Sequence, residues 1–355
     1  MEAQVFVSRC TRYDYKQIKK DILRALNLLG VRGVIEKGQA VLVKPNMLQG
    51  FSPDKCATTH PAFLKAVIEA LQSLGAYIVV GDCPANLKVG LIDKYLEIAE
   101  ITGVKKVVEE TKAKLVYPDE ILEVSNWAVS KIAIDIGMIV NVPKLKGHGL
   151  TVISGSVKNM FGLVPGLRKL NHHVNHKGRV GFSRILVDLC SMLKPSLTLM
   201  DAIYILDEEG SVKREPKMMG AIIAALDPFV ADLVACKLLK LDYLAVPTIV
   251  DSIAKKMIPD PESIQISGDD LNSFDASSLK FRTEEGNRQV NRRKGEQVPK
   301  IDKQKCISCG ACVRLCIASA IRVAEENEDI LIEEDFCEKC YCCIESCRAG
   351  AIYLD

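Results

Sequence analysis

The chain has 355 residues, so we expect two or three domains. With 48% apolar residues it can bury a substantial core, and its formal net charge of +2 excludes a bulk electrostatic affinity for nucleic acid or for a membrane surface. The 14 cysteines come with no amino-terminal signal pattern and no uncharged apolar run of the roughly 18 residues that a membrane helix needs. We therefore expect a cytoplasmic protein with reduced cysteines, without membrane insertion and without a nucleic-acid partner.

The first 245 residues alternate β-rich apolar runs with helical patterns. The runs predicted as strands lie at Val5–Val7, Ala40–Val43, Tyr77–Val80, Met138–Val142, Leu197–Met200 and Ala221–Ala225. The helical patterns lie near residues 14–29, 61–73, 90–101, 181–193 and 228–240. This alternation favours an α/β domain over residues 1–245, with a mostly parallel, buried sheet and flanking helices.

Polar residues follow several of these predicted strands. Lys44 and Asn46 follow the second run, Asp82 the third, Lys144 the fourth and Asp201 the fifth. Open α/β sheets bind their ligands beyond the carboxyl ends of the strands. These residues are candidates by position, although the same residue types also serve as ordinary helix caps and turn formers. The two aspartates could orient a base or complete a metal site.

A basic, glycine-rich segment runs from residue 144 to residue 169. If the chain stays extended, Lys144, Lys146 and His148 point to one face, because side chains alternate along a strand. Lys158 and Asn159 follow on a short segment flanked by glycines. Such a surface would suit a phosphate or a carboxylate, and the alternative is a solvated loop that is basic by chance. The predicted ligand-binding set is Lys44, Asn46, His60, Lys144, Lys146 and Asn159.

A second histidine segment follows, with His172, His173 and His176. On a helix the first and the last of these would share a face and could bind a metal ion. No carboxylate lies within the segment, so a role in binding or proton transfer, or a purely structural role, stays open. The candidate catalytic residues are His148, Lys158, His172, His173 and His176.

We interpret residues 246–297 as a connecting segment that ends in a basic linker. The stretch from Arg282 to Lys300 has six basic and three acidic residues. A basic arm that clasps the α/β domain is the alternative interpretation.

Residues 298–355 contain two cysteine runs of the form C-x2-C-x2-C-x3-C. The eight cysteines are Cys306, Cys309, Cys312, Cys316, Cys337, Cys340, Cys343 and Cys347. In this spacing three thiolates hold one cubane iron–sulfur cluster and the fourth reaches the neighbouring cluster. We therefore predict two [4Fe–4S] clusters, with Cys347 closing the first and Cys316 the second. Zinc knuckles are the alternative, but zinc sites usually combine two close cysteines with a distant pair.

This C-terminal part resembles the bacterial two-cluster ferredoxins, which implies a small α+β domain. Its departure from them is Ile317 and Arg348, which stand where the ferredoxins usually have proline. Upstream, the segments 44–46, 58–61, 141–148 and 155–162 together resemble the family catalogued as domain of unknown function 362, whose members are often fused to a ferredoxin-type module. That resemblance implies the α/β domain, the cluster domain and a cytoplasmic setting, but no agreed reaction.

Three functions remain open from the sequence. The first is an iron–sulfur oxidoreductase that passes single electrons to a small anionic substrate or cofactor in the basic crevice. The second is a non-catalytic electron-transfer or binding protein that docks an external redox protein, with the acidic stretch 325–338 as a docking face. The third is a non-redox enzyme whose clusters are structural.

Overall fold

The structure is a computed structural model of the full chain. It describes residues 4–33, 35–85, 87–148, 150–166, 168–169, 172, 176, 178–207, 215–281, 283, 298–316, 319–324, 329–337, 343–344, 347 and 349–353.

An eight-stranded sheet forms the centre of the α/β domain, in the order β12-β1-β11-β10-β7-β2-β3-β4. Within it β11 runs opposite to the other strands, so the predicted mostly parallel sheet is confirmed. The strands are β1 (Gln4–Arg9), β2 (Ala40–Pro45), β3 (Tyr77–Val80), β4 (Lys114–Leu115), β7 (Ile139–Val142), β10 (Leu197–Ile205), β11 (Lys217–Ala225) and β12 (Gln265–Gly268).

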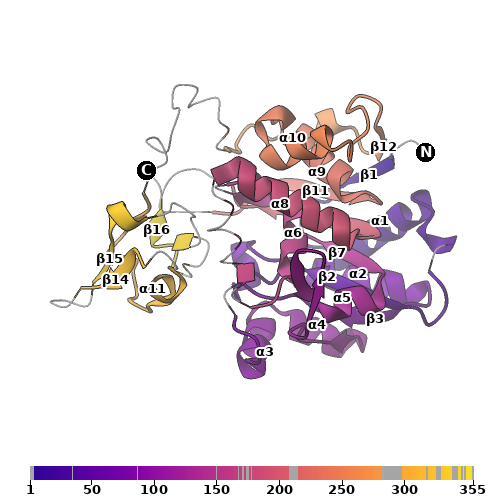
Figure 1. Cartoon of the computed structure of the whole chain (residues 1–355). Coiled ribbons are helices and arrows are strands. Elements are labelled where there is room, and N and C mark those ends of the chain that lie inside the picture. Colours follow the sequence, from indigo (N-terminus) through magenta and orange to yellow (C-terminus); the bar gives the residue numbers. More distant parts are fainter. Residues whose placement is uncertain are drawn as a thin grey trace.

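The central strands are apolar on both faces because helices cover both sides of the sheet (Figure 1). In β2, Val41 and Val43 belong to one core and Leu42 to the other, as the alternation of side chains requires. The first core packs under α1 (Tyr15–Leu28), α2 (Pro61–Ser73), α3 (Ile92–Ile101) and α4 (Val104–Thr111). The second packs under α6 (Ser156–Asn159), α8 (Gly178–Leu193), α9 (Pro228–Leu238) and α10 (Pro247–Ala254).

The sequence marks where several helices begin. The Asp14 side chain accepts the backbone N–H of Gln17 and caps α1. His60 caps α2 and Asp227 caps α9, and each is followed by a proline at the first helical position. All six predicted strands and all five predicted helices are present in the structure, several with longer bounds.

Residues 247–281 belong to the α/β domain, which differs from the connecting segment expected from the sequence. Ile249 of α10 and Phe274 are buried in the second core. β12 pairs in parallel with β1 and forms the edge of the sheet. The turn-rich composition of this region suggested a linker, but its few apolar residues are enough to fix it on the domain. Of the basic linker, residues 282 and 284–297 lie outside the described residues.

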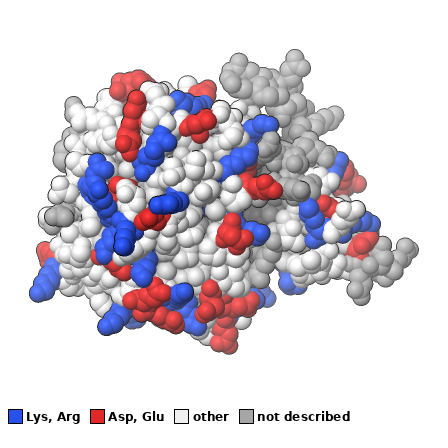
Figure 2. Space-filling view, turned by 180° about the vertical axis from the view of Figure 1, so that it is seen from behind, with Lys and Arg blue, Asp and Glu red and all other residues white. Residues whose placement is uncertain are grey.

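Smaller elements complete the α/β domain. Two hairpins are formed by β5 (Ile121–Val124) with β6 (Trp127–Ser130) and by β8 (Lys146–His148) with β9 (Val152–Ser154). A short helix, α5 (Lys131–Ile136), follows the first hairpin, and a 3-10 turn, η3 (Met160–Leu163), follows α6. On the face shown in Figure 2, basic and acidic side chains are interspersed rather than gathered by sign.

The C-terminal module has its own small core. It contains α11 (Ala311–Leu315) and two strand pairs, β13 (Lys300–Ile301) with β16 (Ile352–Tyr353) and β14 (Ile321–Val323) with β15 (Ile330–Ile332). Ile321, Ile330 and Ile352 pack there with the cysteine side chains. The predicted small α+β, ferredoxin-like domain is confirmed, and Figure 1 shows it to one side of the larger domain.

Candidate functional site

The carboxyl ends of β2, β3 and β7 and the middle of β10 bring polar residues together at one edge of the sheet. Lys44 lies opposite Asn141 in the pairing of β2 with β7, and Lys144 forms a bridge with Asp201 of β10. Asp82 follows β3, with Gly81 between them. This is the edge at which open α/β sheets bind their ligands.

Lys144 is the centre of the first polar cluster. Its Nζ donates to Asp201 Oδ1 at 2.9 Å and to the Tyr13 hydroxyl at 2.7 Å, and the lysine and aspartate side chains are fully buried. The Tyr13 hydroxyl in turn donates to Asp201 at 3.1 Å. Burial and the charge of Asp201 raise the pKa of Tyr13 strongly, so the phenol stays protonated. Two segments distant in sequence are thus tied to the Asp201 carboxylate.

His60 covers this cluster in its neutral form. Its ring stacks on the Tyr13 ring, with centroids 3.5 Å apart, and its backbone N–H donates to Asp201 at 3.1 Å. Its Nδ1 accepts the backbone N–H of Ala62 as the cap of α2. Burial lowers the pKa of His60 to about 4, and Asp201 offsets only part of that effect. At neutral pH the ring therefore carries its proton on Nε2.

Lys44 is the centre of a second cluster. Its Nζ lies 2.7 Å from Asp82 Oδ1, and both side chains are almost completely buried. Asp82 Oδ2 also accepts the backbone N–H of Met47 at 2.9 Å. The backbone of Gly162 packs directly on the pair, where a Cβ atom would clash with both Lys44 Nζ and Asp82 Oδ1. A side chain at position 162 would therefore have to displace this ion pair.

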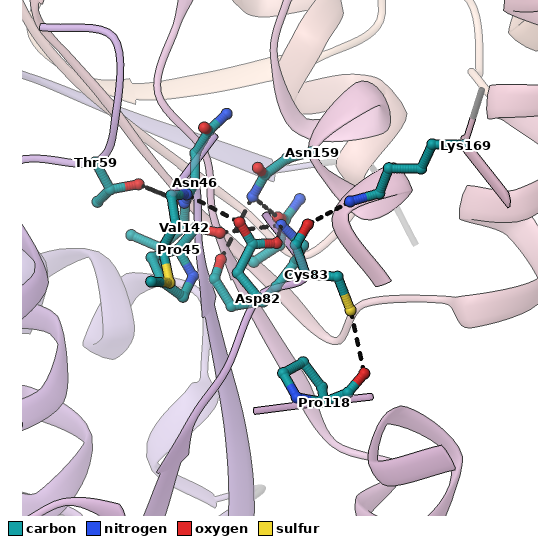
Figure 3. Close-up of polar contacts among 12 residues, drawn as sticks. Pro45, Asn46, Thr59, Asp82, Cys83, Pro118, Val142, Asn159 and Lys169 are labelled. Carbon is teal, nitrogen blue, oxygen red and sulfur yellow. Dashed lines mark hydrogen bonds and ion pairs between the residues drawn. The ribbon is translucent and has the colours of Figure 1, made fainter. Parts of the chain in front are cut away.

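A buried amide network connects α6 to the sheet (Figure 3). Asn159 Nδ2 donates to Asn141 Oδ1 at 2.8 Å, and Asn141 Nδ2 donates to Ser156 Oγ at 2.9 Å. At the start of α6, Asp232 accepts the backbone N–H groups of Ser156 and Val157, at 2.5 Å and 3.0 Å. Burial raises the pKa of Asp232 to about 7. These contacts fix the position of the helix that carries Lys158.

Lys169 reaches the same edge from the segment after η3. Its ammonium group donates to the carbonyl oxygen of Cys83, and its side chain is buried (Figure 3). Burial lowers the pKa of Lys169. Lys169 ends the basic segment predicted from the sequence but was not among the predicted site residues.

The structure differs from the basic crevice predicted from the sequence, because the predicted lysines are buried and paired. Lys44 and Lys144 are buried and paired with aspartates, so neither presents a bare charge to solvent. Lys146 is buried as well, and its Nζ donates to the Ala57 carbonyl oxygen at 2.7 Å. His148 Nδ1 accepts the backbone N–H groups of its own hairpin. Asn46 is half-buried beside the loop before α2, where its backbone N–H donates to Thr59 Oγ1.

The second histidine segment forms a stack of rings. His172 stacks on Trp127 with centroids 4.4 Å apart and on His176 at 5.8 Å, and burial lowers the pKa of His172. His176 Nδ1 contacts the His172 carbonyl oxygen at 3.2 Å. His173 lies outside the described residues. Across the described part of the chain, no three His, Cys, Asp or Glu side chains converge on a single ion.

Tyr13 was not among the residues predicted from the sequence. Tyr13 follows β1, which runs in the same direction as β2 and β7. The strand-end rule that selected Lys44 and Lys144 would have found it, had it been applied to the first strand.

In the C-terminal module the thiols of the two runs approach one another. Burial, with smaller contributions from Cys347, Cys306 and Cys309, raises the pKa of Cys312 to about 11. These four thiols are the set expected around the first cluster, including the ligand from the second run. Three thiolates from one run and a fourth from the other are the ligand set that a cubane takes in this cysteine spacing.

Cys316 and Cys347, the cysteines expected as the fourth ligand of each cluster, have equivalent surroundings. Cys316 Sγ accepts the backbone N–H of Ala320 at 3.1 Å, and Cys347 Sγ accepts that of Ala351 at 3.2 Å. Hydrogen bonds to the sulfurs are among the factors that set cluster potentials. Of the expected ligands, Cys340 lies outside the described residues.

Together these features define an iron–sulfur protein in which an α/β domain with a buried polar site is joined to a ferredoxin-like module. The family model described as domain of unknown function DUF362 matches residues 41–237, and the model described as 4Fe-4S dicluster domain matches residues 298–348. The first match covers more than half of the chain, so the protein belongs to the DUF362 family.

Curated relatives match both parts. A thylakoid-associated protein of Synechocystis is 28% identical over 70% of this chain and 78% of its own length. Pyruvate synthase subunits PorD of Methanocaldococcus jannaschii and Methanothermobacter marburgensis are 35% and 37% identical over 15% and 16% of this chain. Those two matches span 62% and 64% of the subunits. They support an iron–sulfur electron-transfer role for the module.

A solved structure also aligns with the chain. It is the lactate racemase apoprotein from Thermoanaerobacterium thermosaccharolyticum, with a TM-score of 0.42 and 14% identity over 66% of this chain and 56% of that one. Among the described helices, none has the length and apolar character needed to cross a membrane.

Proposed function

We propose that the protein is an oxidoreductase in which two [4Fe–4S] clusters supply single electrons to an anionic substrate or cofactor held at the carboxyl edge of the sheet. The observation that carries this proposal is the occurrence of two buried ion pairs, Lys144–Asp201 and Lys44–Asp82, at that edge. Buried ion pairs often stabilise a fold less than apolar residues of the same volume. Two such pairs at a strand-end site are therefore better explained by chemistry than by folding.

Tyr13 and Lys144 provide the proton that must accompany each electron. Tyr13 is partly exposed, and its oxygen accepts a hydrogen bond from Lys144. Because burial and Asp201 raise the pKa of Tyr13, its proton goes only to a strongly basic group, such as the anion that the substrate forms when it gains electrons, and the hydrogen bond from Lys144 stabilises the phenolate that remains. The stacked ring of His60 fixes the orientation of the phenol. Solvent returns the proton, and an external one-electron carrier is the reductant.

Anaerobic turnover of reduced methyl viologen tests this proposal. The reconstituted full chain should oxidise the viologen continuously when a suitable phosphorylated or carboxylated acceptor is present. Tyr13→Phe should lower that rate roughly a hundredfold, which is typical for loss of a general acid, while the iron content stays unchanged. Tyr77→Phe is the matched control, because Tyr77 is exposed at the opposite end of β3.

The outcome also separates the enzyme from a carrier. A carrier would oxidise viologen once, in proportion to its clusters, and stop with every acceptor in the panel. An unchanged rate in Tyr13→Phe would show that Tyr13 takes no part in the reaction. We place the activity in the cytoplasm, where cluster thiolates stay reduced.

A further inference from the structure

The two cysteine runs lie in segments of opposite charge. Residues 298–316, which end at the fourth cysteine of the first run, contain four basic residues and one acidic residue. Residues 329–347, the segment of equal length that ends at the fourth cysteine of the second run, contain one basic residue and six acidic residues. Two residues before the fourth cysteine, the first run has Arg314 and the second has Glu345, which lies outside the described residues. Because each run supplies three ligands to one cluster, we expect the two clusters in different electrostatic surroundings.

Arg314 lies directly against the first cysteine run. Its Nη2 donates to the carbonyl oxygen of Cys309 at 3.1 Å. A Cβ atom at Gly310 would lie 3.1 Å from Arg314 Nη1, so the guanidinium group packs on the loop between Cys309 and Cys312. The backbone N–H of Arg314 also donates to the Gly310 carbonyl oxygen, at 3.1 Å. The short helix α11 therefore begins at this loop and holds Arg314 one turn further on, against an expected cluster ligand.

Two lysines near the first run have acidic partners. Lys303 Nζ lies 2.6 Å from Asp329. Lys305 Nζ lies 3.4 Å from Asp302, so the charge of each lysine is offset by a carboxylate. Arg314 instead contacts a carbonyl oxygen, which carries no full charge. Its positive charge therefore acts on the neighbouring cluster, with some screening by solvent because the side chain is exposed.

We propose that Arg314 raises the reduction potential of the first cluster, the one with three ligands from the first run, above that of the second. Adding an electron makes a cluster more negative, so a nearby positive charge favours the reduced form and nearby carboxylates disfavour it. Each cluster takes up one electron, which the external carrier loses, and transfer from the second cluster to the first is then favourable. This inference rests on the two clusters of the proposed function, to which it adds the direction of electron transfer within the module.

Potentiometric titration of the reconstituted full chain, followed by electron paramagnetic resonance at constant ionic strength, tests this inference. The wild type should show two midpoint potentials. Arg314→Gln keeps a donor but removes the charge, and it should lower the higher potential by a roughly three- to tenfold change in the reduction equilibrium, about 30 to 60 mV at 59 mV per tenfold. The lower potential should shift by less than half as much. Arg314→Glu should lower the higher potential about twice as far, and Arg314→Lys should keep most of it. Lys106→Met, which removes an exposed charge from α4, should change neither potential.

A single midpoint potential for both clusters in the wild type would overturn the inference, and so would potentials that are unchanged or equally shifted in Arg314→Gln. A larger shift of the lower potential would also overturn it, because Arg314 would then act on the second cluster. Iron content establishes that each variant carries its clusters, and any one of the three variants at position 314 that keeps its iron decides the matter. A protein without clusters would contradict the proposed function itself, whereas two clusters of equal potential would contradict this inference alone.

Discussion

At the residue scale, the lysine–aspartate pairs dominate the energetics of the site. Lys144 and Asp201 are fully buried and share the Tyr13 hydroxyl. Removing one member of such a pair leaves a buried charge without its counter-charge, which is more costly than never having the pair. The site therefore depends on both members, although the pair itself adds little to stability.

Lys144→Met should lower the free energy of unfolding by about 3 to 5 kcal/mol. The double variant Lys144→Met/Asp201→Asn should recover much of that loss, because the buried charge is gone. Urea unfolding followed by fluorescence measures the effect, and the single tryptophan, Trp127, reports on the α/β domain. Lys255→Met is the control and should cost at most about 1 kcal/mol, because its pairs are partly exposed. Equal losses for both lysines would contradict the account.

The depressed pKa of His60 predicts a pH dependence of stability. Its pKa is lowered from 6.5 to about 4 in the folded state, so the unfolded chain binds more protons between those values. Stability should therefore fall as the pH is lowered, by about 2 kcal/mol between pH 7 and pH 5. His60→Asn keeps a residue that can cap α2 and should lose this contribution. The same slope in the variant and the wild type would assign the effect to other groups.

At the scale of elements, short glycine-flanked segments hold the site together. η3 passes so close to the Lys44–Asp82 pair that position 162 has no room for a side chain. Gly155 is likewise required, because a Cβ there would clash with the Asp232 carboxylate that caps α6. At these two positions the backbone itself, rather than a side chain, packs against the buried carboxylates.

Gly162→Ala should cost about 1 to 3 kcal/mol of stability, because the added methyl group must displace a buried ion pair. Gly33→Ala is the matched control, since a Cβ at Gly33 meets no atom within 4 Å. Thermal unfolding of the two variants side by side makes the comparison. A neutral Gly162→Ala would show that the pair can move away without loss.

Most strands and helices could be predicted from the sequence because short stretches of neighbouring residues determine them. The apolar run Ala40–Val43 and the His60–Pro61 helix start each need only neighbouring residues to be recognised. β12 could not be predicted in this way, because a short polar strand is stabilised by pairing with β1, far away in the chain. The same holds for the site. Lys44, Lys144, Asp82 and Asp201 were all found by position, but which lysine pairs with which aspartate depends on contacts between strands that are distant in the sequence.

At the scale of the whole molecule, one chain combines an electron-transfer module with a polar site on a separate domain. The module has its own small core, and the thiols around Cys312 come from both cysteine runs. Because each cluster takes a ligand from the other run, loss of either run should disturb both clusters. This interdependence follows from the order of the cysteines and does not require the α/β domain.

Metal and sulfide analysis of the full chain, purified and reconstituted without air, tests the central claim most directly. Two cubanes predict roughly eight iron and eight acid-labile sulfide per chain, with a one-electron signal by electron paramagnetic resonance after reduction. A colourless, iron-free protein, or one that holds zinc in place of iron, would contradict the account.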